Sequence, residues 1–207
     1  MNHLPHDFTE QEEEIIRTHR TPEQVQEFLD TLQYNYEPCG ATLRSFRKVI
    51  RDGVAHCLEG AVTAAAILMQ HGHRPYILCI EARDIDHNVV PYRENRLWGA
   101  VAQSRDPPLK SKPPTFPTLR DLVLSYYPDY YNAITNDRND LTPRGYTLID
   151  LSSEKKDWVT AEEEIWFIEV KLYDARYRAL FPEEGKEEFR SLRSGDIAWI
   201  SPSSANR

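Results

Sequence analysis

The chain has 207 residues, a formal net charge of −8 and a hydrophobic content of 40%, which suits one globular domain with a sizeable core. An acidic chain lacks the basic footprint of a general nucleic-acid binder, so we expect neither DNA nor RNA as a partner. No apolar run approaches the roughly 20 residues of a membrane span, and the acidic start of the chain does not resemble a signal peptide. We therefore expect no membrane partner and a cytoplasmic location; the sequence predicts no oligomeric state.

The three cysteines are an odd and widely spaced set. Cys39, Cys57 and Cys79 include no C-x-x-C pair. This spacing argues against a disulfide scaffold and against a structural zinc site. A metal site built from His56, Cys57 and His87 also lacks compact ligand spacing, so we expect no metal and no cofactor.

Two helices are predicted at the N-terminus. The first is acidic and covers residues 8–19. The second covers residues 21–36, with Thr21 as N-cap, Pro22 at the first helical position and Gln24 completing a capping box. The apolar residues of the second helix recur on one face. We expect residues 1–36 to form a helical extension packed on the core.

The middle of the chain predicts a buried helix followed by a small sheet. Residues 54–71 are apolar around almost the whole circumference of a helix, which indicates burial on most sides. Residues 74–82, 86–92 and 96–104 have the composition of strands, and a polar turn joins the last two. Residues 74–104 are therefore expected to form an antiparallel sheet.

Residues 105–118 contain five prolines and cannot pair inside a sheet, so they are predicted to be a surface loop or a covering strap. A helix is expected over residues 118–132, ending at Pro128. Its tyrosines are interpreted as packing residues rather than as a binding platform. The sequence does not show whether the proline-rich segment 107–117 acts as a lid.

The C-terminal part is predicted to contain a last strand at residues 146–152 and a long helix over residues 161–181. The tail beyond Pro182 is charged and then serine-rich, which is typical of disorder from about Ser201.

The order of these elements predicts the α+β class, with a central buried helix packed on a small antiparallel sheet and flanking helices at both ends. The predicted organisation is a helical extension at 1–36, a main domain at 37–182 and a charged, partly disordered tail at 183–207.

Cys57 lies at the N-terminus of the predicted buried helix, a position that lowers the pKa of a thiol. Unpaired amides and the helix dipole at an N-terminus lower a thiol pKa, and the thiolate is the nucleophilic form. Cys57 shares a helix face with Ala61, Ala64 and Leu68, so it should face the following sheet. Free cysteine more often packs as a small hydrophobe, which is our interpretation of Cys79 in its apolar strand.

A nucleophilic cysteine needs a histidine base within hydrogen-bond reach. His87 lies in one of the predicted strands and is the candidate. His56 precedes Cys57 but points about 100° away on a helix, which makes it a poor base for that thiol. Glu59, in the first turn of the helix, is explained by the dipole alone.

The order of these motifs resembles the core of the transglutaminase-like superfamily of papain-like cysteine enzymes. The matching positions are Cys57 in "GVAHCLEGA", Gly72 and Pro75 in "HGHRPYIL", His87 in "DHNVVPY" and Trp98 in "RLWGAVAQS". The resemblance covers residues 45–105, half or less of the chain. It implies a cysteine at the head of a buried helix, followed by strands that carry histidine and aspartate.

The chain departs from this family at the third position, where Ala102, Gln103 and Ser104 replace the expected aspartate. A hairpin turn at residues 95–96 would place Ser104 opposite His87, so its hydroxyl would orient the imidazole. A turn at residues 94–95 would place Ala102 there, and His87 would need help from Gln103, Asp86, Asp106 or water.

The resemblance implies a cysteine-dependent acyl-transfer enzyme that acts on an amide or thioester through an acyl-thioester at Cys57. Hydrolysis, transamidation and cyclisation all remain open, and the substrate is expected to be a small molecule or a peptide. We expect Ser104 to join Cys57 and His87 in catalysis. The substrate-binding residues expected around them are His56, Trp98 and Gln103.

The alternative hypothesis is a catalytically inactive, transglutaminase-like binding protein, because a missing aspartate is what a decayed site would show. A weaker alternative is an interaction module built on the acidic helices, although charge runs of this length are usually solvated faces.

Overall fold

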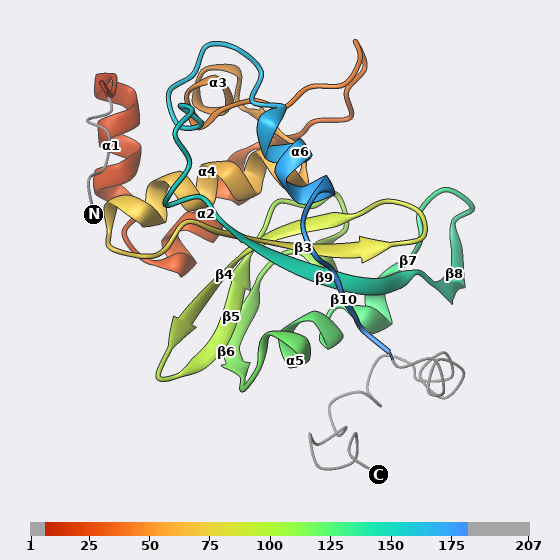
Figure 1. Ribbon diagram of the computed structural model, residues 1–207. Helices are drawn as coiled ribbons and strands as arrows, with labels where there is room; N and C mark the ends of the chain where they lie inside the picture. The colour runs from red at the N-terminus through yellow and green to blue at the C-terminus, as the bar shows by residue number, and fades with distance from the viewer. Residues whose placement is uncertain (1–6, 182–207) are drawn as a thin grey trace.

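The computed structural model describes residues 7–181 and confirms the α+β class (Figure 1). The helices are α1 (Glu10–Thr18), α2 (Pro22–Thr31), α3 (Phe46–Asp52), α4 (Cys57–Gln70), α5 (Leu119–Leu124) and α6 (Phe167–Tyr173), with 3-10 turns η1 (Pro107–Leu109) and η2 (Tyr127–Asp129). The strands are β1 (Gln33–Tyr34), β2 (Val54–Ala55), β3 (Tyr76–Ala82), β4 (His87–Glu94), β5 (Leu97–Val101), β6 (Lys112–Phe116), β7 (Tyr131–Asn132), β8 (Asp137–Leu141), β9 (Pro143–Asp150) and β10 (Arg178–Ala179).

A six-stranded sheet of order β10-β9-β3-β4-β5-β6 separates two apolar layers. Figure 1 shows α4 on one side of this sheet and α5 on the other. Side chains alternate along a strand, so Ile77 and Cys79 join the cluster around α4, while Leu78 and Ile80 join the cluster around α5. The sheet is larger than the predicted one, because β9 pairs along β3 and β6 extends the other edge.

The central helix is buried as its composition predicts. Residues 58–69 of α4 are all buried. The helix begins at Cys57 rather than at residue 54, since Val54 and Ala55 instead pair in parallel with β1. The same pairing ends α2 at Thr31, so the predicted helix over residues 21–36 is too long at its C-terminal end.

The N-terminal helices pack against α4, with α1 and α2 both in contact with it. The predicted capping box at Thr21 and Gln24 is confirmed. The predicted tail, residues 183–207, lies outside the described residues.

The hairpin of β4 and β5 adopts the first of the two predicted registers. Its turn residues, Asn95 and Arg96, have φ of 47° and 70°, and Glu94 pairs with Leu97. Positive φ at both turn positions is the type I′ geometry that suits a two-residue hairpin. This register points Ser104 toward His87, but the pairing stops at Val90 and Val101.

Beyond β5 the chain leaves the sheet, because residues 102–103 form hydrogen bonds with α2 and its C-terminal end instead of with β4. Gln26 accepts the Ala102 N–H and donates to the Ala102 carbonyl. The Gln103 side chain donates to the carbonyls of Leu29 and Leu32 at 2.9 and 3.1 Å. These bonds open the sheet beside His87.

The proline-rich segment follows as η1 and β6. β6 is an edge strand, the one place in a sheet that tolerates proline, so this segment is partly a strand rather than only a loop or strap.

Two further helices, α5 and α6, are also shorter than predicted. α5 ends at Leu124, and the chain continues through η2 around Pro128. The predicted helix over residues 161–181 is wrong outside Phe167–Tyr173, because residues 161–166 run as an irregular segment that bonds to the loop before α3 through Ile165 N–H and Leu43 O. Tyr126, Tyr127 and Tyr130 are buried, as their interpretation as packing residues requires.

Among residues 7–181, no helix is both long enough and apolar enough to cross a bilayer.

A substitution at Gly60 tests how closely α4 approaches the chain that follows β5. A Cβ at Gly60 would lie 2.4 Å from Cβ of Gln103, so Gly60→Ala forces the two segments apart. We expect this variant to lose roughly 1–3 kcal/mol in urea unfolding, as overpacked cores do. Glycine to alanine inside a helix otherwise stabilises. Unchanged or raised stability would therefore contradict the close contact.

Candidate active site

His56 caps the helix that carries Cys57. Its Nδ1 accepts the Leu58 N–H at 3.2 Å, and its Nε2 donates to the Thr42 carbonyl at 2.9 Å. Both ring nitrogens are therefore used in holding the cap to the loop above it. Burial lowers the pKa of His56, but its hydrogen bond and charge interaction with Cys57 outweigh burial and raise that pKa to about 9. A histidine whose pKa lies this far above neutral is a poor general base for the thiol.

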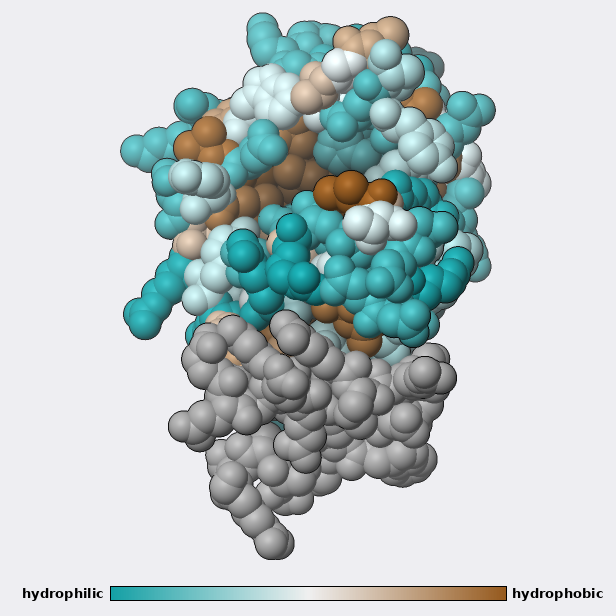
Figure 2. All heavy atoms as spheres, turned by 90° about the vertical axis from the view of Figure 1, so that its right-hand side faces the viewer, coloured by the Kyte–Doolittle hydropathy of each residue, from teal (hydrophilic) through white to brown (hydrophobic). Residues whose placement is uncertain are grey.

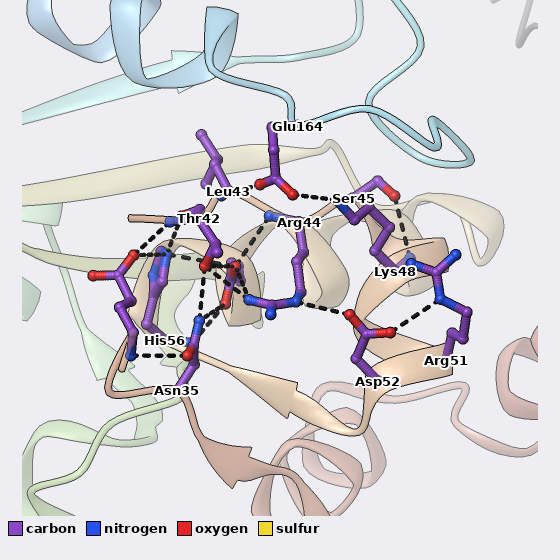
Figure 3. A network of polar contacts seen from close by, with 12 residues as sticks. Asn35, Thr42, Leu43, Arg44, Ser45, Lys48, Arg51, Asp52, His56 and Glu164 are labelled. Atoms are coloured by element: carbon purple, nitrogen blue, oxygen red, sulfur yellow. Dashed lines mark hydrogen bonds and ion pairs between the residues drawn. The ribbon is translucent and has the colours of Figure 1, made fainter. Parts of the chain in front are cut away.

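A buried carboxylate, that of Glu59, organises the same cap, and Figure 3 shows the four residues that supply its donors close together: Asn35, Thr42, Arg44 and His56. Glu59 is fully buried, and its Oε2 accepts from the His56 N–H at 3.0 Å and from Asn35 Nδ2 at 3.1 Å. Its Oε1 accepts from the Thr42 hydroxyl at 2.9 Å, from the Arg44 N–H at 3.1 Å and from Arg44 Nη1 at 3.0 Å. Glu59 thus does more than respond to the helix dipole: it ties residues 35–44 to the head of α4.

Burial alone would raise the pKa of Glu59, but His56 and these hydrogen bonds hold that pKa below its ordinary value. Glu59 therefore stays ionised, and the loop stays fixed, at neutral pH.

Cys57 is the first residue of α4 and is partly exposed. Its Sγ lies 3.8 Å from the carbonyl oxygen of Asp86 and 3.9 Å from Nδ2 of Asn88. Burial would raise the thiol pKa, but hydrogen bonding and charge from His56 and His87 hold that pKa well below its ordinary value. The amide of Cys57 is among those at a helix N-terminus that have no acceptor within the helix.

His87, at the start of β4, is held by a backbone carbonyl. Its Nε2 donates to the Leu109 carbonyl at 2.7 Å, and the residue is 4% exposed. The rings of Tyr126 and Tyr130 meet it edge-on, with centroids 5.9 and 6.3 Å away. With Nε2 so bonded, Nδ1 is the nitrogen free to serve Cys57.

The carbonyl that orients His87 comes from η1 in the proline-rich segment. Leu109 is buried, and the next carbonyl, that of Lys110, accepts the Tyr126 hydroxyl at 2.9 Å. The segment thus packs over the gap that opens where β5 leaves β4. No side-chain motif marks this partner, which is why the sequence indicated Ser104 instead.

The other predicted site residues, Ser104, Gln103 and Trp98, make the following contacts. The Ser104 hydroxyl accepts the Asp106 N–H at 3.1 Å, and the Ser104 N–H donates to Gln103 Oε1 at 2.9 Å. Trp98 contacts the guanidinium of Arg93, 5.1 Å from the ring centroid. Ser104 and Gln103 therefore shape the exit from β5, and Trp98 lies at the far end of that strand.

A cavity of about 860 Å³ opens over Cys57. It lies between the loop at residues 34–43, the β3–β4 turn and α6, and Figure 2 shows a hollow with hydrophobic residues on this face. His56 and Asn88 are among its lining residues. The described residues that line it do not include Trp98, Gln103 or His87.

Asn88 and Leu109 were not predicted as site residues. Strand alternation gave one available signal, because it places Asn88, the neighbour of His87, on the face of α4. Within residues 7–181, no group of three or more His, Cys, Asp or Glu side chains is arranged to hold a metal ion.

The sequence matches no protein-family model and no curated protein.

We expect Glu59→Gln to lower the free energy of unfolding at pH 7 by about 2–4 kcal/mol, because it removes the charge that five donors share. The pKa of Glu59 is depressed in the folded protein, so its contribution is full above the ordinary value of 4.5 and is lost as the pH falls through the folded value. Urea unfolding at several pH values should show the two proteins converging in acid. Glu13→Gln, at an exposed carboxylate of α1, is the control and should change little. A constant difference across pH would contradict the assignment.

Tyr126→Phe should loosen the segment that presents the Leu109 carbonyl. Loss of the hydroxyl bond to Lys110 is expected to cost about 1 kcal/mol of stability. It should also slow alkylation of Cys57 at pH 7 by roughly three- to tenfold, because His87 is less firmly oriented. Tyr146→Phe, in the same apolar cluster, is the matched control. Equal alkylation rates in both variants would remove the link between the segment and the thiol.

Proposed function

We propose that this protein is a cysteine-dependent acyl-transfer enzyme with a transglutaminase-like site. One observation carries the proposal: a thiol with a strongly lowered pKa lies at a helix start, opens onto a cavity and interacts with a histidine whose other nitrogen is fixed. Perturbed pKa values in a cleft are typical of functional sites. A cysteine that only packs would need none of these features.

In the proposed reaction, Cys57 gives its proton to Nδ1 of His87, and the sulfur attacks the carbonyl carbon of an amide or thioester. The Cys57 amide donates to the developing oxyanion. When the tetrahedral intermediate collapses, the bond to the leaving amine or thiol breaks, and that group takes the proton from His87. Water or an amine then attacks the acyl-thioester and frees the thiol.

The site favours His87 over His56 as the base. The pKa of His56 is raised to about 9, which makes it a poor base at neutral pH, and its two nitrogens also bond to the Leu58 N–H and the Thr42 carbonyl, whereas His87 uses only Nε2. The Leu109 carbonyl fixes the tautomer with the proton on Nε2, which leaves Nδ1 able to accept one from sulfur.

A carbonyl does part of what an aspartate does in the resembled family. It fixes the orientation of the ring and its tautomer, but it brings no negative charge to stabilise the imidazolium. The buried rings of Tyr126 and Tyr130 exclude water from the same bond. We infer that this site relies on a fixed ring and a low thiol pKa rather than on a charged third residue.

Alkylation by iodoacetamide tests the proposal. We expect Cys57 to react faster than free cysteine at pH 6, and His87→Ala to slow it by about tenfold or more, because one unit of thiol pKa is a tenfold change in thiolate at that pH. A Cys39→Ser background removes the exposed thiol. His73→Ala, beyond the far end of α4, is the control.

Ordinary reactivity of Cys57 that His87→Ala leaves unchanged would contradict the proposal. It would favour the alternative hypothesis, a binding protein that uses the same cavity without catalysis.

A further inference from the structure

A tyrosine of the short strand β1 lies beside the segment that leads into Cys57. Tyr34 pairs in parallel with Ala55, and the Asn35 N–H donates to the Ala55 carbonyl at 3.2 Å. Cys57 follows Ala55 by two residues and begins α4. The pairing of β1 with β2 therefore fixes Tyr34 next to the head of the helix that carries the thiol.

The side chain of Tyr34 faces the cavity rather than the network of Glu59. Successive side chains of an extended segment alternate between its two faces. Asn35 reaches Glu59 with Nδ2 at 3.1 Å, whereas the rings of Tyr34 and Tyr36 meet each other, with centroids 5.0 Å apart. Tyr34 and Cys57 both line the cavity of about 860 Å³. The contact with Tyr36 thus holds the Tyr34 ring beside the space onto which the thiol opens.

The hydroxyl of Tyr34 is an unpaired donor that a molecule in the cavity can reach. No group among residues 7–181 forms a hydrogen bond with it. Tyr34 is partly exposed, and its hydroxyl is not one of the buried polar atoms that lack a partner in this part of the chain. A ligand in the cavity can therefore accept a hydrogen bond from it.

The phenol of Tyr34 keeps its proton at neutral pH. Burial and then the charge of Cys57 raise the pKa of Tyr34, and Arg105 only partly opposes them. The charge interaction also shows that the hydroxyl and the sulfur are neighbours across the cavity. Tyr34 is thus a neutral O–H donor close to the reacting atom.

The proposed reaction needs a donor of this kind. Attack by sulfur makes the carbonyl oxygen of the substrate negative, and oxyanion sites usually combine a backbone N–H with a second donor, which can be a tyrosine hydroxyl. The Cys57 N–H is the first. Other polar groups at the sulfur are unsuited to be the second, because the Asp86 carbonyl only accepts and Asn88 directs Nδ2 at the sulfur itself.

We propose that the Tyr34 hydroxyl is the second oxyanion donor of this site and acts together with the Cys57 N–H. As the S–C bond forms, the π electron pair of the carbonyl moves to oxygen, and both donors bind that oxygen until the pair returns and the leaving group departs. A hydrogen bond that strengthens only in this state lowers the barrier without tightening substrate binding. This inference rests on the proposed acyl-transfer function and adds a catalytic residue to it.

Two reactions of the same thiol test this role. Acylation by p-nitrophenyl acetate passes through a tetrahedral oxyanion and releases p-nitrophenolate, whereas iodoacetamide is attacked at carbon with direct loss of iodide and forms no oxyanion. Both rates are measured at pH 7 in the Cys39→Ser protein, after subtraction of the rates of Cys57→Ser in that background. We expect Tyr34→Phe to slow acylation by about ten- to hundredfold and to change alkylation by less than about twofold.

Tyr36→Phe is the matched control, because it removes the hydroxyl of the neighbouring tyrosine, which is 72% exposed, and keeps the ring that contacts Tyr34. Both of its rates should equal those of the parent protein. Thermal unfolding of Tyr34→Phe should also match the parent, since its hydroxyl has no hydrogen bond within residues 7–181 to lose.

The outcomes separate the two proposals. Acylation of Tyr34→Phe at the parent rate overturns the role of Tyr34. An equal loss in both reactions also overturns it, because that result indicates a change in the thiol rather than in the oxyanion. In either case, acylation of Cys57 in the parent protein still supports the acyl-transfer function. If the parent releases no more p-nitrophenolate than Cys57→Ser, the function is overturned, and this inference with it.

Discussion

The buried charge of Glu59 is the interaction on which the site depends. One carboxylate, fully buried, accepts hydrogen bonds from the cap of α4 and from the loop at residues 35–44. Those two segments form the floor and one wall of the cavity over Cys57. A buried charge is tolerated only where its partners are all in place, so the ionised Glu59 permits a single arrangement of the wall. Glu59 thereby defines the surroundings of the thiol through the cap and the loop that it holds together.

The second constraint acts from the opposite side of the sheet. β5 leaves β4 after Val101, and η1 fills the gap with the Leu109 carbonyl on His87. The thiol of Cys57 and the turn η1 approach His87 from different layers of the fold. Its position at the start of β4, where the sheet opens, is what allows one ring to meet both.

Local patterns were enough to predict the buried helix, the capping box of α2 and the β4–β5 hairpin, because each depends on residues close in sequence. The orientation of His87 was not predictable, since its partner is a main-chain atom 22 residues away. Ser104 was the natural choice from the hairpin register, which is correct, but α2 diverts the chain one residue after the last pair. The prediction of a long C-terminal helix was wrong for a similar reason. Residues 161–166 bind the loop before α3, and this tertiary contact overrides the helical spacing of the sequence.

The use of a main-chain oxygen to hold His87 has an evolutionary consequence. A side-chain partner is lost by one codon change, whereas a carbonyl persists through any substitution at Leu109 that keeps the chain path. The prolines around it restrict that path before folding, so the oxygen is placed at a low entropic cost. The path of the backbone, rather than the identity of a side chain, therefore determines how His87 is oriented. A search for a conserved acidic residue would overlook sites of this kind.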